Sequence, residues 1–170
     1  IQGQSFVPIL KDPEAQVRDL IFAEHNWHVY KNHERMLRFG DYLYIRNNFP
    51  NQPNLCYESD NTFPAGGELW KAHAAGKTHA RQQQVFANPC PQEELYRVSQ
   101  NMHQLASLVD NPRYAGPLAK ARKLLKTWTQ QTGDTIPANP RLNRHAPPRI
   151  ENGKIIPKGK KPKRSGPVEM

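Results

Sequence analysis

The chain has 170 residues, a formal net charge of +9 and an apolar content of 36%. This composition leaves room for one modest hydrophobic core with polar appendages, and two cysteines are too few for a disulfide-rich scaffold. No run of about 18 apolar residues occurs, which excludes a membrane-spanning helix, and the first residues lack the pattern of a signal peptide. The chain begins at Ile1 rather than at Met, so we expect further sequence to precede it.

The first predicted elements are strands. Residues 19–25, which read DLIFAEH, and residues 34–39 and 41–47 are rich in β-branched and aromatic side chains, as strands are. The FGD motif around Gly40 is typical of a tight turn, so we predict an antiparallel hairpin beside an earlier strand.

A long loop and two short helices are predicted next. Residues 47–66 are dense in Asn, Pro and Gly and are expected to be irregular. GELWKAHAAGK is expected to form a helix closed at Gly76, and THARQQQVF a second helix with Thr78 as its N-cap. Trp70 lies on an apolar helical face and is expected to be a core residue.

A strand that begins at Glu94 and a long helix within residues 112–133 complete the predicted elements. The apolar residues of this helix recur at i, i+3, i+7 and i+10, and they are Leu118, Ala121, Leu125 and Trp128. Asp110 or Asn111 can cap its start and Gly133 can end it. We expect this helix to pack on the sheet through its apolar face.

Residues 138–170 form a basic tail. From residue 141 onward there are nine Lys and Arg against two Glu, a net charge of +7, whereas the rest of the chain holds 15 basic and 13 acidic residues. The tail is rich in Pro, Gly and Lys, so we expect it to be extended or disordered. Its GKKPKR motif could bind polyanions or could remain a solvated segment. Nucleic acid is the less expected polyanion, because no stacking aromatic side chains accompany the lysines.

Ionisable residues are unusually dense between positions 24 and 38, where they include Glu24, His25, His28, His33, Arg35 and Arg38. A metal site is disfavoured because a strand places His25 and His28 on opposite faces unless a turn intervenes. A catalytic acid–base role lacks a nucleophile or triad partner. Recognition of a polar or anionic ligand is the preferred interpretation, most strongly for His28.

Two alternatives to recognition remain open. The charged residues could be solvated strand-edge groups, with Arg35 and Arg38 bound to backbone carbonyls or to acidic residues such as Asp41. Trp27 could stack on a ligand ring or belong to the core. Cys56 and Cys90 could form one disulfide or remain free thiols, and their spacing offers no metal site.

Residues 93–134 contain an ordered set of short motifs: E-E-L-Y at Glu93, then Leu108, Trp128 near the helix end, and T-G-D at its close. This order resembles the C-terminal signature of the sulfatase family, in which E-E-L-Y-D-L, D-P-x-E, N-L-A, a helix ending in Trp, and T-G-D follow one another. Arg97 departs from the signature where Asp is usual, and Asn101-Met102 stands in place of Asp-Pro.

A second block, IFAEHNWHVYKNHERMLRFGDYLYIRN, is similar to the preceding segment of sulfatases of the heparan N-sulfatase type and their bacterial relatives. His28, Arg35, Arg38 and the Y-I-R-N sequence that starts at Tyr44 occupy matching places. The resemblance covers roughly residues 3–137, so residues 1–137 are expected to be a sulfatase C-terminal subdomain.

What the resemblance implies is an α+β fold: a small, mostly antiparallel sheet with a long packed C-terminal helix, docked beside an alkaline-phosphatase-like catalytic domain. The family's formylglycine nucleophile, made in C/S-x-P-x-R, and its calcium ion are expected in that missing N-terminal domain, because neither motif occurs here. The chain alone should therefore be inactive, with no catalytic residue and no metal or cofactor of its own.

The resemblance further implies a sulfated saccharide, such as a glycosaminoglycan, as the substrate, with His28, Glu24, Arg35 and His25 as the residues that bind it. It implies a periplasmic, secreted or lysosomal location. The alternatives are a non-catalytic polyanion-binding module that acts through the basic tail, and a separately expressed remnant with only an interaction role.

Overall fold

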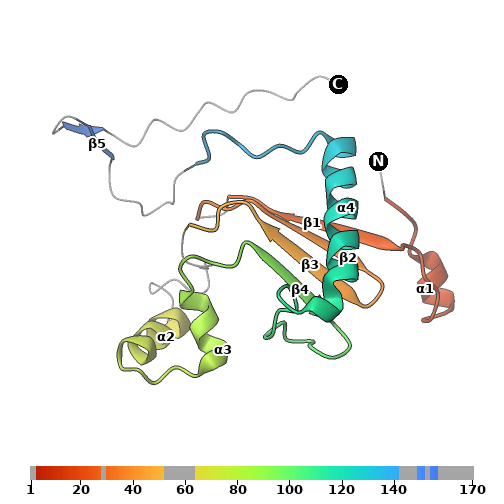
Figure 1. Ribbon diagram of the computed structural model, residues 1–170, viewed down its shortest axis with the longest axis horizontal. Coiled ribbons are helices and arrows are strands. Elements are labelled where there is room, and N and C mark those ends of the chain that lie inside the picture. Colours follow the sequence, from red (N-terminus) through yellow and green to blue (C-terminus); the bar gives the residue numbers. More distant parts are fainter. Residues whose placement is uncertain (1–2, 28–29, 52–63, 142–148, 152–153, 157–170) are drawn as a thin grey trace.

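The computed structural model describes residues 3–27, 30–51, 64–141, 149–151 and 154–156, and its centre is an antiparallel sheet covered by a long helix (Figure 1). The strands lie in chain order: β1 (Leu20–His25), β2 (Glu34–Phe39), β3 (Tyr42–Asn47) and β4 (Glu93–Arg97). Each neighbouring pair is antiparallel, and α4 (Ala115–Thr132) packs on one face. The predicted α+β fold is confirmed.

The remaining elements are short and peripheral. They are α1 (Val7–Lys11), α2 (Pro64–Ala74), α3 (Ala80–Gln83), the 3-10 turns η2 (Gln84–Phe86) and η3 (Pro112–Tyr114), and the paired strands β5 (Arg149–Glu151) and β6 (Lys154–Ile156). The sequence did not predict α1. The β5–β6 pair lies in the segment expected to be extended or disordered, so part of that tail is extended and paired. None of the described helices is long and apolar enough to cross a membrane.

The β2–β3 hairpin turns where the FGD motif predicts it. Phe39 pairs with Tyr42, and between them Gly40 takes a left-handed φ of 51°. This conformation suits glycine, which has no Cβ to clash with the backbone. The carboxylate of Asp41 accepts a hydrogen bond from Arg97 Nε at 2.8 Å, which ties the turn to β4.

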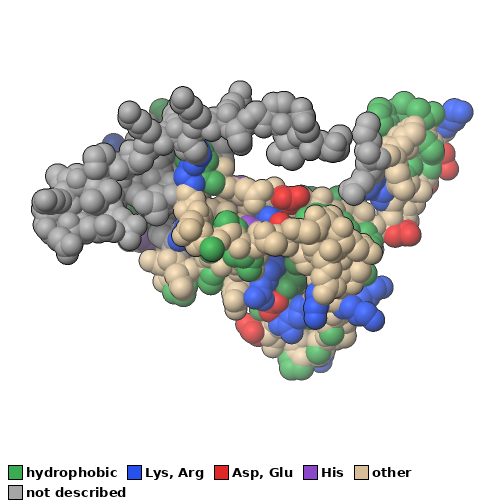
Figure 2. Space-filling model, turned by 90° about the horizontal axis from the view of Figure 1, so that it is seen from above, with side chains coloured by type: hydrophobic (Ala, Val, Ile, Leu, Met, Phe, Trp, Pro, Cys, Tyr) green, Lys and Arg blue, Asp and Glu red, His purple; other side chains and the backbone are tan. Residues whose placement is uncertain are grey.

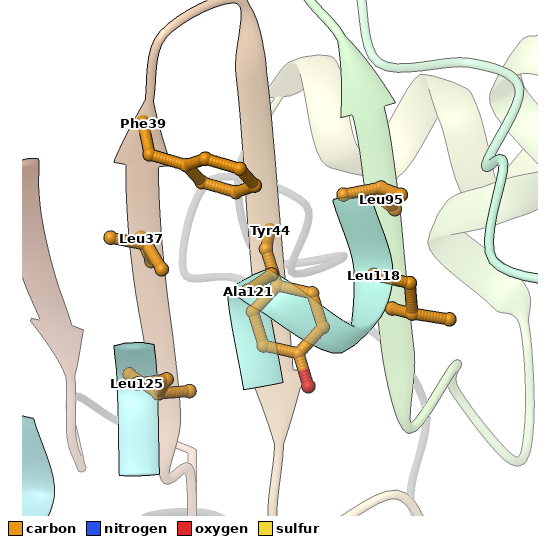
Figure 3. Packing of buried hydrophobic residues seen from close by; sticks show 7 residues of the cluster. All are labelled: Leu37, Phe39, Tyr44, Leu95, Leu118, Ala121 and Leu125. Carbon is orange, nitrogen blue, oxygen red and sulfur yellow. The ribbon is translucent and has the colours of Figure 1, made fainter. Parts of the chain in front are cut away.

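The hydrophobic core lies between the sheet and α4 (Figure 3). Its buried members are Leu37, Phe39, Tyr44, Leu95, Leu118, Ala121 and Leu125. Burial alternates along β2, where Arg35, Leu37 and Phe39 are buried and the residues between them are less so. A strand with this period turns every second side chain to one face, so Arg35 lies on the same face as the core.

Trp128 and Trp70 have different surroundings. Trp128 packs against the core as predicted, with its ring stacked on that of Phe22 at a centroid distance of 5.0 Å and an interplanar angle of 8°. Trp70 instead meets Phe86 edge-on, at a centroid distance of 5.1 Å. The prediction that Trp70 belongs to the core is wrong, because α2 packs its ring against η2 rather than against the sheet.

The boundaries of the two middle helices also need correction. The first, α2, begins at Pro64, earlier than predicted, and the turn after it closes at Gly76 with a φ of 66°, as expected. The N-cap of α3 is His79 and not Thr78. The backbone N–H of His79 donates to Gln82 Oε1 at 3.1 Å. A side chain of the first turn thus supplies a hydrogen-bond acceptor at the N-terminus of the helix.

Cys90 is a free, buried thiol. The amide Nδ2 of Asn47 donates to its Sγ at 2.8 Å, and burial raises the pKa of the thiol. The alternative of a disulfide to Cys56 is therefore not realised, and Cys56 itself lies outside the described residues.

The ends of α4 are set by two predicted residues. Asn111 Oδ1 accepts a hydrogen bond from the backbone N–H of Arg113 at 3.1 Å and so caps η3, which leads into α4. Gly133 ends the helix with a φ of 67°, and its backbone N–H donates to the Thr129 carbonyl. Asp134 is the next residue, so the left-handed conformation of Gly133 determines the position of the Asp134 side chain.

Replacing Gly133 by Ala is expected to lower the free energy of unfolding by about 1 kcal/mol, because a Cβ is strained in this left-handed conformation. The new Cβ would meet no atom within 4 Å, so the cost arises from the backbone and not from a clash. Gly116→Ala, in equally open surroundings inside α4, is the matched control and should be neutral or stabilising by up to about 1 kcal/mol. Urea unfolding midpoints compare the two, and equal losses would contradict the expectation.

Candidate functional site

A buried ion pair joins the end of α4 to β2. Arg35 is 3% exposed, and it donates from Nε to Asp134 Oδ2 at 2.8 Å and from Nη2 to Asp134 Oδ1 at 2.7 Å. Such a two-pronged contact is the strongest geometry between a guanidinium and a carboxylate. The Arg35 guanidinium holds the pKa of Asp134 below its ordinary value.

The other N–H groups of Arg35 also have partners. Nη1 donates to Asn26 Oδ1 at 3.1 Å and to the Glu34 carbonyl at 2.7 Å, while Nη2 lies 2.9 Å from His33 Nε2. Four of the five N–H donors of the guanidinium therefore have oxygen acceptors within the chain, and the fifth faces the His33 ring. This arrangement matches the alternative stated in the sequence analysis, in which Arg35 binds a backbone carbonyl and an acidic residue of the same chain.

His33 is packed into the same junction. It is 2% exposed, its Nε2 lies 3.1 Å from the Thr135 carbonyl oxygen, and its Nδ1 lies 2.9 Å from Asn48 Nδ2. The edge of the ring meets Phe49, with centroids 5.9 Å apart. These contacts hold Thr135, which follows α4, close to Asn48 and Phe49, which follow β3.

A first cleft, the Trp27 cleft, lies beside the Arg35–Asp134 pair and has a volume of about 450 Å³. Its lining includes Glu24, Asn26, Trp27, Asn32, Asn139 and Arg141. Trp27 is half-buried, and the Arg141 guanidinium carbon lies 5.1 Å from the centroid of its ring. An aromatic ring among amides and a carboxylate suits a polar ligand, because each amide can both donate and accept.

The predicted binding residues occupy different positions. Glu24 lines the Trp27 cleft with a side chain 47% exposed, and it lies 3.7 Å from Arg35 Nη2, which lines the same cleft. His25 lies on the opposite face of β1, where its Nδ1 is 2.8 Å from Glu34 Oε2. The structure therefore brings Glu24 and Arg35 together and separates His25 from them. His28 lies outside the described residues.

A second cleft, the Arg46 cleft, adjoins the first and has a volume of about 630 Å³. It lies between the sheet and the second half of α4, and its charged lining includes Arg46, Glu93, Arg122 and Lys126. The two clefts share His33, Arg35 and Asp134. The buried ion pair is thus a common wall, and a ligand longer than one unit could contact both clefts.

Glu93 is the centre of the Arg46 cleft. Arg122 donates to its two carboxylate oxygens at 3.0 and 2.5 Å, Arg46 Nη1 lies 3.0 Å away, and the Tyr44 hydroxyl donates at 2.5 Å. The bond from Arg122, followed by that from Tyr44, lowers the pKa of Glu93 to about 2. The carboxylate stays charged at neutral pH, and its bonds join β3, β4 and α4.

Neither cleft presents a metal centre within the described residues, where no group of three or more His, Cys, Asp or Glu could hold a metal ion. The charged and amide groups that the clefts do present are guanidinium, ammonium, carboxylate and side-chain amide. These groups bind and orient a ligand through charge and hydrogen bonds.

Sequence reasoning missed the Arg46 cleft. Two signals were available in the pattern. Arg122 and Lys126 are four residues apart on one helix, so their side chains lie on the same side. Their helix is expected to lie against the sheet, and there Arg46 and Glu93 are directly opposite each other on β3 and β4. Only the observed crossing of α4 over these strands brings the two pairs together.

Comparison with known proteins gives a likeness at the level of solved structures only. No protein-family model and no curated protein matches the chain. The chain is similar to a 2-O GAG sulfatase with 20% identity and a TM-score of 0.47, over 86% of this chain and 25% of that chain. It is similar to a candidate sulfatase from Bacteroides thetaiotaomicron VPI-5482 with 19% identity and a TM-score of 0.46, over 95% of this chain and 26% of that one.

The chain therefore spans about a quarter of the length of each of these two proteins.

Proposed function

We propose that the chain is the C-terminal part of a sulfatase that acts on sulfated saccharides, and that it contributes substrate recognition. The observation that carries the proposal is the meeting of the motif residues in the fold. The T-G-D motif supplies Asp134, which Arg35 binds, and the E-E-L-Y motif supplies Glu93, which Arg46 of the Y-I-R-N motif binds.

These contacts give a physical reason for the motifs to occur together. Arg35 and Asp134 are 99 residues apart, and Tyr44 and Glu93 are 49 apart. Each pair holds the sheet to α4 or one strand to the next, so losing one partner would leave a charge or a hydroxyl without its bond. A set of spaced motifs whose members bind each other supports the resemblance better than the same letters scattered over the surface would.

Within this proposal the bond that is hydrolysed is a sulfate ester or a sulfamate, and the nearest functional type is heparan N-sulfatase, because of the second matched block. The partner is an N-terminal catalytic domain that supplies the formylglycine nucleophile and the calcium ion. This chain fits neither group: it contains no C/S-x-P-x-R sequence, and the described residues offer no metal-binding group. The location would be the periplasm, the cell exterior or the lysosome.

The proposed role of this chain is to position the saccharide. Glu24 lines the Trp27 cleft and would accept hydrogen bonds from a sugar hydroxyl or amine. Arg35 would act by holding Glu24 and Asp134 in place. His28 remains a proposed ligand-binding residue. His25 lies on the opposite face of β1 and would bind only a part of the ligand that reaches beyond the Trp27 cleft.

The experiment that tests the proposal is to sequence the coding DNA upstream of Ile1 and to assay the complete gene product for sulfate release. We expect an in-frame C/S-x-P-x-R sequence and release of sulfate from heparin or heparan sulfate oligosaccharides. A reading frame without that sequence, whose product releases no sulfate, would overturn the proposal.

In the complete enzyme, Glu24→Gln is expected to lower kcat/KM about tenfold, because one charge-assisted hydrogen bond to the saccharide is lost. Glu68→Gln, which removes the same charge from an exposed position on α2, is the control and should leave kcat/KM unchanged. Steady-state kinetics on a sulfated oligosaccharide compare them. The same test applies to His28→Ala, and unchanged kinetics in both variants would remove these residues from the site.

The second candidate function is polyanion binding by the basic tail. The observation that favours it is the net charge of +7 over residues 141–170, against a nearly neutral body. Binding of this kind weakens steeply as salt is added and does not depend on either cleft.

A further inference from the structure

We propose that the Arg46 cleft is an oxyanion subsite that binds the sulfate or carboxylate group of a saccharide unit next to the one in the Trp27 cleft. The saccharide part of this inference rests on the proposed function. The oxyanion part rests on the side chains of the cleft alone.

The cleft carries an excess of positive charge. Its lining includes the cations Arg35, Arg46, Arg122 and Lys126, which stand against the anions Glu93 and Asp134. Both anions are already engaged by arginines of the same cleft. The balance is therefore two positive charges, which a further anion would offset.

Some of these donors have no partner in the described part of the chain. The Lys126 ammonium makes no hydrogen bond or ion pair there, and Arg46 uses Nη1 for Glu93 and Nε for Asn48, which leaves Nη2 available. Arg46 is 34% exposed and Arg122 is 52% exposed, so both arginines are held in place on one side and open on the other. Preorganised cations that still have a free donor are suited to an incoming oxyanion.

The walls of the cleft favour a ligand larger than a bare ion. Leu125 and Ile136 line it together with the charged groups, so the cleft offers apolar contact to the carbon skeleton of a ligand as well as charge. A volume of about 630 Å³ lies within the range of sites for small organic ligands. Because the Trp27 cleft lies across the Arg35–Asp134 pair, one oligosaccharide could fill both.

The cationic residues of α4 provide a matched comparison. The helix has no acidic residue, and its exposed basic residues are Lys120, Arg122, Lys123 and Lys126. Lys126 lines the Arg46 cleft and Lys123 lines neither cleft. Lys126→Gln and Lys123→Gln therefore remove the same charge from the same helix, but only the first removes it from the proposed subsite. Figure 2 shows a group of Lys and Arg side chains beside a few acidic ones at the lower edge of the view, and further Lys and Arg side chains elsewhere on this face.

The test is calorimetric titration of the 170-residue chain with a heparin-derived tetrasaccharide at fixed salt. We expect Lys126→Gln to raise Kd about fivefold to tenfold, and Lys123→Gln to raise it less than twofold. Equal effects of the two variants would show general charge attraction and would overturn the subsite, as would the absence of binding by the unmodified chain.

Two further arms separate the possible sources of binding. Inorganic sulfate should bind at least tenfold more weakly than the tetrasaccharide, and equal affinity would overturn the saccharide part. Lys160→Gln/Lys161→Gln neutralises two charges of the tail, and an effect larger than that of Lys126→Gln would assign binding to the tail instead.

Failure of this inference can be distinguished from failure of the proposed function. If Lys126→Gln and Lys123→Gln differ as expected but the gene product releases no sulfate, the oxyanion subsite stands and the sulfatase assignment falls. If sulfate is released and the two variants behave alike, the sulfatase assignment stands and the subsite falls.

Discussion

Arg35→Met is expected to lower the free energy of unfolding by about 3–5 kcal/mol, because it leaves Asp134 as an unpaired, poorly solvated charge. The Asp134 side chain is only 15% exposed, and Arg35 supplies both of its guanidinium bonds. A domain of this size is stable by about 5–15 kcal/mol, so the loss is a large share of the total. Urea unfolding followed by circular dichroism measures it.

Two further variants locate the origin of that loss. Arg38→Met is the control, because Arg38 lies on the same strand, is only half-buried, and in the described part of the chain makes one exposed side-chain hydrogen bond, to the Gly40 carbonyl. It should change stability by no more than about 0.5 kcal/mol. Arg35→Met/Asp134→Leu should recover part of the loss, because no unpaired charge remains. A double variant as unstable as the sum of its parts would attribute the loss to packing instead.

The pair also predicts a dependence on pH. The folded-state pKa of Asp134 is lowered from its ordinary value of 3.8, mainly by the bond from Arg35. The stabilisation is therefore fully present above about pH 4 and is lost as the pH falls through the lowered folded-state pKa. The difference between the unmodified chain and Arg35→Met should accordingly shrink in acid.

The fold was largely predictable because its main elements are specified locally. The hairpin follows from Gly40 between two β-rich segments, and α4 follows from an apolar period that a cap at each end encloses. At the start of α3, two residues compete as the N-cap. Thr78 and His79 are adjacent possible caps, and the choice depends on the reach of the Gln82 side chain, which no periodicity encodes.

The site was less predictable because its contacts join distant residues. The alternation along β2 places Arg35 on the same face as Leu37 and Phe39, but it does not show whether the guanidinium is buried or reaches solvent beyond the core. Arg35 is buried because Asp134 meets it from the end of α4, and that partner is 99 residues away. His25 was grouped with Glu24 by proximity in sequence, although the alternation of a strand turns the two side chains to opposite faces.

Glu93→Gln is expected to lower the free energy of unfolding at pH 7 by about 2 kcal/mol, because it weakens charge-assisted bonds from two arginines. Its pKa falls from an ordinary 4.5 to about 2 in the folded chain. The contribution of Glu93 is therefore complete above about pH 4.5 and disappears as the pH falls through about 2. Urea midpoints of the unmodified chain and the variant should converge over that interval.

Glu94→Gln is the matched control, because the neighbouring side chain points to the other face of β4 and titrates in the opposite sense. Burial raises the pKa of Glu94, so folding disfavours its charged form and its contribution declines as the pH rises through that raised value. At pH 7 this variant should be neutral or slightly stabilising. If Glu93→Gln and Glu94→Gln lowered the free energy of unfolding equally, the effect at Glu93 would come from removing a charge on β4 and not from the bonds to Arg46 and Arg122.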